Sequence, residues 1–523
     1  MISGLEILFL VILGWILLML YLSPLLRKSR NFSAYGPALM LKFTKNRRII
    51  ERSAKHFPGR VFGKISNWIV IISAILALAL LAYGAYLTLT VKQVAPVSLR
   101  YLVGLPFLNP AIPIGFGGVS LVVAVVVHEF FHGIVAKKHG IGIKSVGALF
   151  FVIPVGAFVE PDEKDMAEAG PVVRRRIIAS GPGINIVIAV VTLLLLTFVI
   201  MPSASPSHQG LYVESVDAKS PASYVIPTGS EIISLGNFTG NAILNALENS
   251  TFPPGSSQSV VLNDGGKITT LRLPVGIVID STIQGFPAYN ASIPPGSVIV
   301  RVNNVTIYND STLSQILDSI MPGTAVNITV ASYQYVSGTF LSTYKSYHIV
   351  TSSKYYYYQL YDQSANSPAY RNQSFIGVTL TYGGISGVSM DSLAKILSGS
   401  IMFSSPWEGF LNFISLPLLY LSPVPSSTAA LFSVPFSPLI FWGIVNSLYW
   451  LFWIDFLLGI TNALPFFILD GGQFFRDSLQ IASAKKAFSF LRNEKAIRGV
   501  MTLLNLLVFI LFFIEIVVPR VGF

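Results

Sequence analysis

The sequence contains no cysteine and little charge. Because none of its 523 residues is Cys, no disulfide stabilises any part of the chain, and a metal ion would have to be bound without thiolate ligands. Charged residues make up 11% of the chain, whereas 52% are hydrophobic and the mean hydropathy is +0.65. This composition excludes an ordinary soluble protein and indicates one that resides mainly in a bilayer. Only six histidines occur, which argues against a zinc transporter with imidazole relays across several helices.

Long apolar runs recur along the chain. A bilayer-spanning helix needs about 20 predominantly apolar residues, and six runs are long enough to span. We therefore predict a polytopic α-helical membrane protein of the cell membrane, with about six transmembrane helices. A cleaved signal peptide is the alternative for the first run. The predicted spans lie near residues 4–24, 68–91, 115–136, 177–201, 436–460 and 499–518.

The net charge of +11 is concentrated in three loops. Of the 35 Lys and Arg residues, eleven lie in 27–64, seven in 137–176 and six in 476–498. If six helices alternate in direction, these loops share one side, and the positive-inside rule assigns that side to the cytoplasm. The charge therefore indicates topology and attraction to the lipid bilayer, and we expect no nucleic-acid partner. The long polar segment 202–398 then lies outside the cytoplasm.

An HExxH motif occurs inside an apolar run. His128 and His132 are four residues apart, so on a helix they share one face and can both bind one zinc ion. Between them, Glu129 is placed to act as a general base toward a water molecule. Two core histidines satisfied by their neighbours are the alternative, but each polar group buried in lipid needs a partner or a function. The motif predicts hydrolytic chemistry within or at the edge of a bilayer.

A second motif lies far downstream, in the segment that runs from Asn462 to Gly472. A catalytic zinc site uses three protein ligands, and Asp470 can supply the ligand that the two histidines leave missing. The Gly471-Gly472 pair permits a close backbone approach, while Pro465 interrupts helical hydrogen bonding. Taken alone, the Asp-Gly-Gly sequence is only a turn signal.

Together these two motifs resemble the site-2 protease family of intramembrane zinc metalloproteases. That family pairs an HExxH helix with a later N-x-x-P-x-x-x-x-D-G motif, and this chain has both in the same order. The resemblance implies one catalytic Zn²⁺ held by His128, His132 and Asp470, with Glu129 as the catalytic base. Its implied substrates are transmembrane proteins or peptides, which are cut within or near their membrane helices.

Two further segments match the family between these motifs. Residues 153–159 are similar to a loop that forms a β-hairpin and aligns an extended substrate, which implies substrate contacts for Gly156, Ala157, Phe158 and Val159. Residues 180–185 resemble the G-P-x-x-N sequence that opens the next core helix. The resemblance implies that Asn185 and Asn462 also contact substrate.

The extracytoplasmic insert contains a weak internal repeat. Its two copies, offset by 66 or 67 residues, resemble PDZ domains in a mostly β fold, with a pair of other β modules as the alternative. Tandem PDZ-like domains at this place are similar to the bacterial envelope-stress members of the family. PDZ domains bind an extended peptide as an added strand. The residues implied as PDZ ligand loops are Gly210, Leu211, Tyr212, Val213, Gly276, Ile277, Val278 and Ile279.

These observations divide the chain into seven predicted parts. Two membrane helices, a basic loop and a re-entrant segment occupy 1–114, and the HExxH half of the catalytic core occupies 115–201. The PDZ-like domains cover 202–274 and 275–350, and an extension without an assigned fold covers 351–400. The second half of the core occupies 401–475, and a cytoplasmic loop with the last helix occupies 476–523.

The sequence as a whole predicts an intramembrane zinc metalloprotease that acts in regulated intramembrane proteolysis. The alternative from another class is a catalytically inactive membrane receptor or scaffold, in which PDZ-like domains bind ligands and the zinc is structural. A structural zinc site has no need of Glu129, which favours the protease. The sequence sets no oligomeric state.

Overall fold

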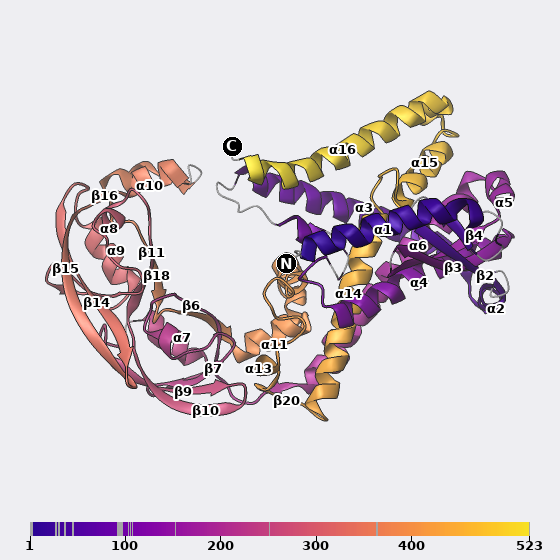
Figure 1. The fold of residues 1–523 in the computed structure, drawn as a ribbon. Coiled ribbons are helices and arrows are strands. Elements are labelled where there is room, and N and C mark those ends of the chain that lie inside the picture. The colour runs from indigo at the N-terminus through magenta and orange to yellow at the C-terminus, as the bar shows by residue number, and fades with distance from the viewer. Residues whose placement is uncertain are drawn as a thin grey trace. The chain divides into compact units, whose positions relative to one another are not determined.

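A computed structural model provides the structure of the chain. It describes residues 4–26, 29, 32–35, 38–43, 47–90, 98–102, 104, 106, 108–151, 153–249, 251–361 and 365–521. The chain forms two compact units (Figure 1). Unit 1 contains residues 1–196 and 446–523, and unit 2 contains residues 197–445.

Unit 1 is built mainly from long apolar helices. Among the described residues of the chain, five helices are long and apolar enough to cross a membrane. They are Gly59–Thr90, Ile114–Lys138, Pro171–Ser203, Pro438–Asn462 and Glu494–Arg520, which correspond to five of the six predicted spans. The first predicted span falls on a helix whose described apolar stretch, Leu13–Leu26, is shorter than the other five.

The helices of unit 1 come from both ends of the chain. Helix α14 belongs to unit 1 only from residue 446 onward. The bounds are α1 (Gly4–Leu26), α2 (Arg47–His56), α3 (Gly59–Thr90), η1 (Leu99–Leu102), α4 (Ile114–Lys138), α5 (Glu163–Glu168), α6 (Pro171–Leu195), α14 (Pro438–Asn462), α15 (Asp470–Ala482), η8 (Lys486–Arg492) and α16 (Glu494–Val521).

Local sequence explains where the central helices begin and end. Helix α6 starts with Pro171 at its first position, where the missing N–H costs nothing. Helix α4 ends on Lys137 and Lys138, whose charges complement the negative end of the helix dipole. Packing centres on α6, which contacts α3, α4 and α15. Its buried stretch 177–185 is therefore enclosed by three helices that come from both halves of the sequence.

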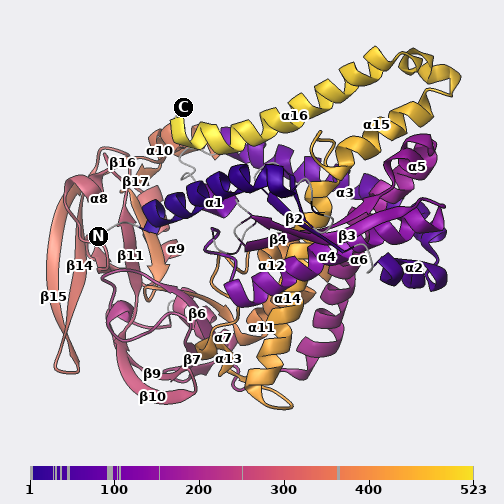
Figure 2. The ribbon, with the colours of Figure 1, turned by 45° about the vertical axis from the view of Figure 1, so that its right-hand side comes forward.

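A four-stranded antiparallel sheet accompanies these helices. Its order is β1-β2-β3-β4, with β1 (Phe32–Tyr35), β2 (Ala38–Phe43), β3 (Ile143–Phe151) and β4 (Ile153–Pro161). Strands β3 and β4 form the hairpin that the family resemblance implied, and the N-terminal segment adds β1 and β2 to it. Strand β4 runs beside α4 (Figures 1 and 2). Because β4 is the last strand in the order, its outer edge pairs with no other strand in the described part of the chain.

Hydrogen bonds to one carboxylate fix β4 against its neighbours. Glu160 on β4 accepts from Lys42 Nζ of β2 at 3.1 Å and from Ser145 Oγ of β3 at 2.5 Å. Burial raises the pKa of Glu160, but these hydrogen bonds outweigh burial and leave the pKa below its ordinary value. The charged form of Glu160 thus stabilises the sheet at neutral pH.

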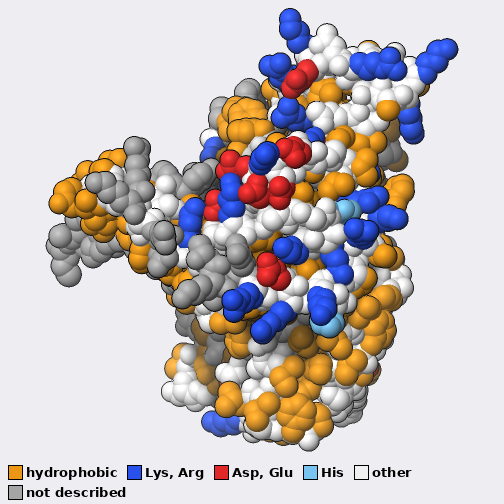
Figure 3. Space-filling model, turned by 90° about the vertical axis from the view of Figure 1, so that its right-hand side faces the viewer, with side chains coloured by type: hydrophobic (Ala, Val, Ile, Leu, Met, Phe, Trp, Pro, Cys, Tyr) orange, Lys and Arg blue, Asp and Glu red, His pale blue; other side chains and the backbone are white. Residues whose placement is uncertain are grey.

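Basic side chains gather at one end of unit 1. Helices α2, α5 and α15 all lie at this end (Figures 1 and 2), and the space-filling view of it shows many Lys and Arg side chains (Figure 3). Helices α2 and α5 lie within the first and second of the three basic loops of the sequence, and α15 overlaps the third. The fold therefore brings described helices from all three loops to the same end of the unit.

Unit 2 contains two larger antiparallel sheets. Their strand orders are β10-β9-β7-β6-β19 and β15-β14-β12-β11-β18, and β8 and β13 pair with β7 and β12. Separate hydrophobic cores support the two sheets, one around Leu211 and Val260 and the other around Ile277 and Ile328. The middle of the chain is thus largely β structure, as the sequence predicts.

The bounds of the strands and helices of unit 2 are as follows. The strands are β5 (Ser205–Pro206), β6 (Leu211–Val216), β7 (Glu231–Leu235), β8 (Phe238–Thr239), β9 (Ser257–Asp264), β10 (Lys267–Pro274), β11 (Ile277–Thr282), β12 (Val298–Val302), β13 (Val305–Thr306), β14 (Ala325–Val336), β15 (Thr339–Val350), β16 (Ser352–Ser353), β17 (Ser374–Phe375), β18 (Val378–Tyr382), β19 (Ile385–Ser389) and β20 (Phe432–Ser433). The helices are α7 (Asn241–Glu248), α8 (Pro287–Asn290), α9 (Asp310–Asp318), α10 (Lys354–Tyr361), α11 (Met390–Ser398), α12 (Pro406–Ile414) and α13 (Ser426–Ala429).

The extension 351–400 supplies one strand to each of the two sheets. Strand β18 pairs with β11, and β19 pairs with β6, so the strands of the predicted PDZ ligand loops are interior strands. Residues 211–213 and 277–279 are buried there, between β7 and β19 and between β12 and β18 respectively. A peptide could be added to β6 or β11 only by displacing β19 or β18.

Candidate metal centre

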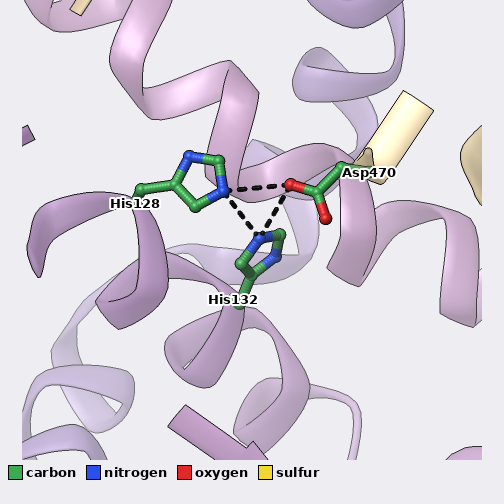
Figure 4. Close-up of side chains that lie close together, drawn as sticks. All are labelled: His128, His132 and Asp470. Atoms are coloured by element: carbon green, nitrogen blue, oxygen red, sulfur yellow. Dashed lines mark hydrogen bonds and ion pairs between the residues drawn. The ribbon is translucent and has the colours of Figure 1, made fainter. Parts of the chain in front are cut away.

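Three side chains from two distant helices meet in unit 1. His128 and His132 lie on α4, and Asp470 is the first residue of α15, 342 positions after His128 (Figure 4). Asp470 Oδ2 lies 3.0 Å from His128 Nε2 and 3.2 Å from His132 Nε2, and the two Nε2 atoms are 3.2 Å apart. The three residues predicted as metal ligands therefore converge on one point.

Hydrogen bonds at Nδ1 orient both imidazole rings. His132 Nδ1 donates to the backbone oxygen of Ile177 at 2.8 Å, and His128 Nδ1 donates to Asn185 Oδ1 at 2.6 Å. With Nδ1 protonated, each Nε2 directs its lone pair toward Asp470 Oδ2. Three atoms with lone pairs this close repel one another unless a cation or a proton lies among them. The donor set of two imidazoles and one carboxylate fits a zinc ion.

Glycines allow the backbone to approach this centre. A Cβ at Gly181 of α6 would overlap the Nε2 atoms of His132 and His128, so only glycine fits beside the imidazoles. A Cβ at Gly471 would overlap the backbone oxygen of Leu464. The close backbone approach predicted for the Gly471-Gly472 pair is thereby confirmed. Asn505 on α16 fixes the same turn, because its Oδ1 accepts from the backbone N–H of Phe467 at 2.7 Å.

Glu129 is half-buried beside β4. The backbone N–H of Val159 donates to Glu129 Oε2 at 3.4 Å. This carboxylate forms part of the wall of a cavity of about 460 Å³, whose other walls are mainly apolar. The cavity is lined by Phe43, Ile49, Ile50, Leu121, Val122, Val125, Val126, Glu129, Phe130, Val146, Gly147, Ala148, Gly156, Ala157, Phe158 and Val159. The four β4 residues with predicted substrate contacts thus share one cavity with the predicted base.

The two asparagines with predicted substrate contacts have different surroundings. Asn185 is fully buried, and its Nδ2 donates to Asp455 Oδ1 at 2.6 Å and to the backbone oxygen of Ala124 at 3.2 Å. Its amide is therefore committed to contacts within the protein. Asn462, at the end of α14, is half-buried, and within the described residues its side chain has no hydrogen-bond partner. Of the two, only Asn462 retains a free amide.

Sequence reasoning did not identify Asp455 or the backbone oxygen of Ile177. The signal for Asp455 was a single carboxylate inside the predicted span 436–460, where an ionisable residue is costly and indicates a function. The role of Ile177 had no signal in the sequence, because any residue type offers the same backbone oxygen.

The fold and the site together define a class, a multi-pass membrane protein with an HExxH metallopeptidase centre. The chain belongs to peptidase family M50, the site-2 protease family, because the model of this family matches residues 116–508. This range includes all three converging side chains and the whole of unit 2. The resemblance noted in the sequence is therefore confirmed at the level of the family.

One relative is similar over about half of the chain. An uncharacterized protein of Methanocaldococcus jannaschii is 28% identical over 295 residues, which cover 53% of this chain and 74% of that protein. It carries no assigned activity, so the assignment of this chain as a membrane metalloprotease rests on the family.

Proposed function

We propose that the protein is a zinc-dependent intramembrane endopeptidase, which hydrolyses peptide bonds within or near the transmembrane helices of membrane-protein substrates. The convergence of His128, His132 and Asp470 is the observation that carries this proposal. It places a complete catalytic zinc ligand set on helices that are apolar enough to span a membrane.

The chemistry follows from the side chains around this point. A zinc ion held by the three residues would lower the pKa of a bound water toward neutrality and polarise the scissile carbonyl. The Glu129 carboxylate takes a proton from the attacking water and returns it to the leaving amine. Its contact with the Val159 N–H keeps the carboxylate next to the strand that borders the cavity.

The cavity and the edge of β4 support binding of an extended peptide. A transmembrane helix hides its carbonyls in internal hydrogen bonds, so a substrate must unwind locally before hydrolysis. Strand β4 offers the backbone groups of an unpaired edge to such a segment, in the manner of strand addition. The apolar walls around Gly156, Ala157, Phe158 and Val159 suit apolar substrate side chains. The free amide of Asn462 provides a further hydrogen-bonding group for the extended segment.

The topology of the predicted enzyme follows from its charges. We infer six transmembrane helices, with α1 as the first, and a cytoplasmic location for the basic end of unit 1. Unit 2 then lies outside the cytoplasm, where its two PDZ-like domains would exclude or sort substrates by the size of their outer parts, since β6 and β11 are already paired on both sides. This arrangement suits regulated intramembrane proteolysis, in which the substrates are single-pass proteins already shortened by another protease.

The test is cleavage of a model single-pass helix by the purified full-length protein in liposomes, with the cut located by mass spectrometry. Zinc-dependent cleavage inside the helix is expected for the native protein. Glu129→Gln should retain zinc and lose about 10²- to 10⁴-fold in rate, the usual contribution of a general base. Glu163→Gln, an exposed carboxylate on α5, is the matched control and should cleave normally.

The receptor or scaffold alternative predicts a different outcome. Native protein and Glu129→Gln would then bind zinc equally, and neither would cut any member of a panel of helices that unfold easily. That result would contradict the protease proposal and direct attention to ligands of unit 2.

A further inference from the structure

A buried carboxylate in α14 lies behind the metal centre. Asp455 is 0% exposed, and its Oδ1 accepts from Asn185 Nδ2 at 2.6 Å. Asn185, also 0% exposed, accepts from His128 Nδ1 at 2.6 Å. Three helices thus contribute to one chain of side chains: Asp455 from α14, Asn185 from α6 and His128 from α4.

The carboxylate determines which way round the Asn185 amide lies. In its ionised form a carboxylate only accepts hydrogen bonds, and the Asn185 amide accordingly turns its Nδ2 toward Asp455 Oδ1. The second hydrogen on Nδ2 is taken by the backbone oxygen of Ala124, one turn before His128 on α4. Asn185 Oδ1 is then left facing His128, where it can only accept. In the opposite orientation the amide would place Nδ2 against His128 and its oxygen against Asp455, so it would offer no donor to the carboxylate.

The orientation of the amide in turn sets the tautomer of His128. Because Asn185 Oδ1 accepts, Nδ1 of His128 carries the proton, and the lone pair of a neutral imidazole is on Nε2. A flipped amide would donate to Nδ1 and favour the tautomer with the proton on Nε2. That tautomer cannot bind a metal through Nε2, the atom that lies 3.0 Å from Asp470 Oδ2.

The second histidine provides an internal comparison. His132 Nδ1 donates to the backbone oxygen of Ile177, a group that accepts and cannot flip. His132 therefore needs no further residue to set its tautomer, whereas His128 depends on an amide that could lie either way. This difference explains why a carboxylate is found behind only one of the two imidazoles in the described part of the chain.

We propose that Asp455 is a positioning residue of the metal centre, which fixes the Asn185 amide and thereby holds His128 in the tautomer that binds metal through Nε2. The inference rests on the proposed function, because it assigns a role at the same site. A carboxylate in a predicted membrane span is costly, and Asp455 Oδ2 has no partner among the described residues. A leucine would pack there at lower cost, so packing alone does not account for the residue.

The test measures metal affinity in the full-length purified protein, by competition with a chelator and by the visible spectrum of the Co²⁺ form. Asp455→Leu removes the acceptor and should weaken Zn²⁺ and Co²⁺ binding about 10- to 100-fold, as loss of an outer-shell partner does. Asp455→Asn keeps an oxygen that can accept from Asn185 but adds a donor that suits the flipped amide, so its affinity should lie between those of native and Asp455→Leu. Trp450→Phe, a buried side chain of the same helix with aromatic neighbours, is the control and should bind as native.

An exchange of the two side chains avoids variants that fail to fold. Asn185→Asp places two carboxylates against each other and should weaken binding as strongly as Asp455→Leu. The double variant Asn185→Asp with Asp455→Asn restores one amide and one carboxylate at nearly unchanged volume. It should recover much of the native affinity and the Co²⁺ spectrum, although the carboxylate at 185 no longer donates to the Ala124 backbone oxygen. Recovery in this pair would support the proposal even if Asp455→Leu did not fold.

Two results would overturn the inference. One is native metal affinity in folded Asp455→Leu, and the other is a double exchange variant no better than Asn185→Asp alone. Failure of the proposed function is distinguishable from either, because affinity is measured without substrate. If the native protein binds no zinc, the proposed protease function is contradicted. If the protein binds zinc but cleaves no peptide, zinc affinity still tests the role of Asp455.

Discussion

At the residue scale, the metal centre depends on a position that has no side chain. Gly181 allows the backbone of α6 to pass directly beside the two imidazoles. An alanine would favour the helix itself by about 1 kcal/mol, so the local cost of glycine is offset by what it permits nearby. Gly181 lies on the same face of α6 as Ile177 and Asn185, which are one turn before it and one turn after it.

We predict that Gly181→Ala weakens zinc binding by about 10- to 100-fold, because the new methyl group displaces one or both imidazoles from the ligand position. Zinc affinity of the purified protein, together with its helical content by circular dichroism, is the measurement. Gly118→Ala on α4 is the matched control, since a Cβ there meets no atom within 4 Å. Native zinc affinity in Gly181→Ala would show that the imidazoles can rearrange without loss.

The sequence predicted the converging residues well, but it did not predict the groups that hold their side chains in place. His128, Glu129, His132 and Asp470 could be chosen because their spacing has one strong chemical meaning. Asn185 was expected to contact substrate, but the structure encloses it completely among protein groups. Its partner depends on how α6 packs against α14, and no local pattern encodes that packing.

At the element scale, helix α15 matters because its first residue is Asp470. It is fastened to α6 by Arg174, whose Nη2 lies 2.7 Å from Asp477 Oδ1 and 2.9 Å from Gln480 Oε1. Only 8% of the Asp477 side chain is exposed. A buried ion pair of this kind costs much when one partner is removed, because the other charge is left without compensation.

Arg174→Met should therefore lower the free energy of unfolding by about 3 kcal/mol and also weaken zinc binding, as α15 loosens. Denaturation in detergent and zinc affinity would be measured side by side. The control is Arg476→Met on α15, the helix that carries Asp477. This change breaks an exposed ion pair with Glu494 and should lower the free energy of unfolding by at most about 1 kcal/mol. Equal losses of stability and zinc affinity in the two variants would indicate that the Arg174–Asp477 pair contributes no more to holding α15 than an exposed ion pair does.

Elements also show where prediction from local pattern stops. The sequence predicted the hairpin β3–β4. It did not predict the full sheet, because β1 and β2 join the hairpin from a segment about a hundred residues earlier. In unit 2 the repeat located β6 and β11, yet their partners β19 and β18 come from an extension with no assigned fold. Strand pairing over such distances depends on the whole chain and not on a window of sequence.

At the scale of the whole molecule, the chain folds as two units that differ in secondary structure. Unit 1 brings the two ends of the sequence together around apolar helices, and unit 2 is the largely β segment between them. The shift in composition and charge near residue 202 lies close to the start of unit 2, whereas the predicted return to the membrane core near residue 400 lies well before residue 445, where unit 2 ends. The metal centre lies entirely within unit 1, between residues that are 342 positions apart.

Removal of the metal should accordingly destabilise unit 1 and leave unit 2 unchanged. A ligand at a thousand times its dissociation constant stabilises the folded state by about 4 kcal/mol, and a chelator should remove that amount. Hydrogen exchange followed by mass spectrometry would locate the change. Peptides from 114–138, 171–195 and 470–482 should exchange faster, whereas those from 211–350 should not. Faster exchange throughout both units would show that the metal stabilises the whole chain.

The pairing of β18 and β19 has a consequence for biosynthesis. These two strands lie within residues 378–389, and each completes a sheet whose other strands were made much earlier. Both sheets therefore stay one strand short until the ribosome has passed Ser389. Up to that moment β6 and β11 each expose a bare edge, the form in which β structure is most prone to aggregate. The insert consequently matures in a single late event, and a nascent chain stalled before residue 378 should be a substrate for chaperones and quality-control proteases.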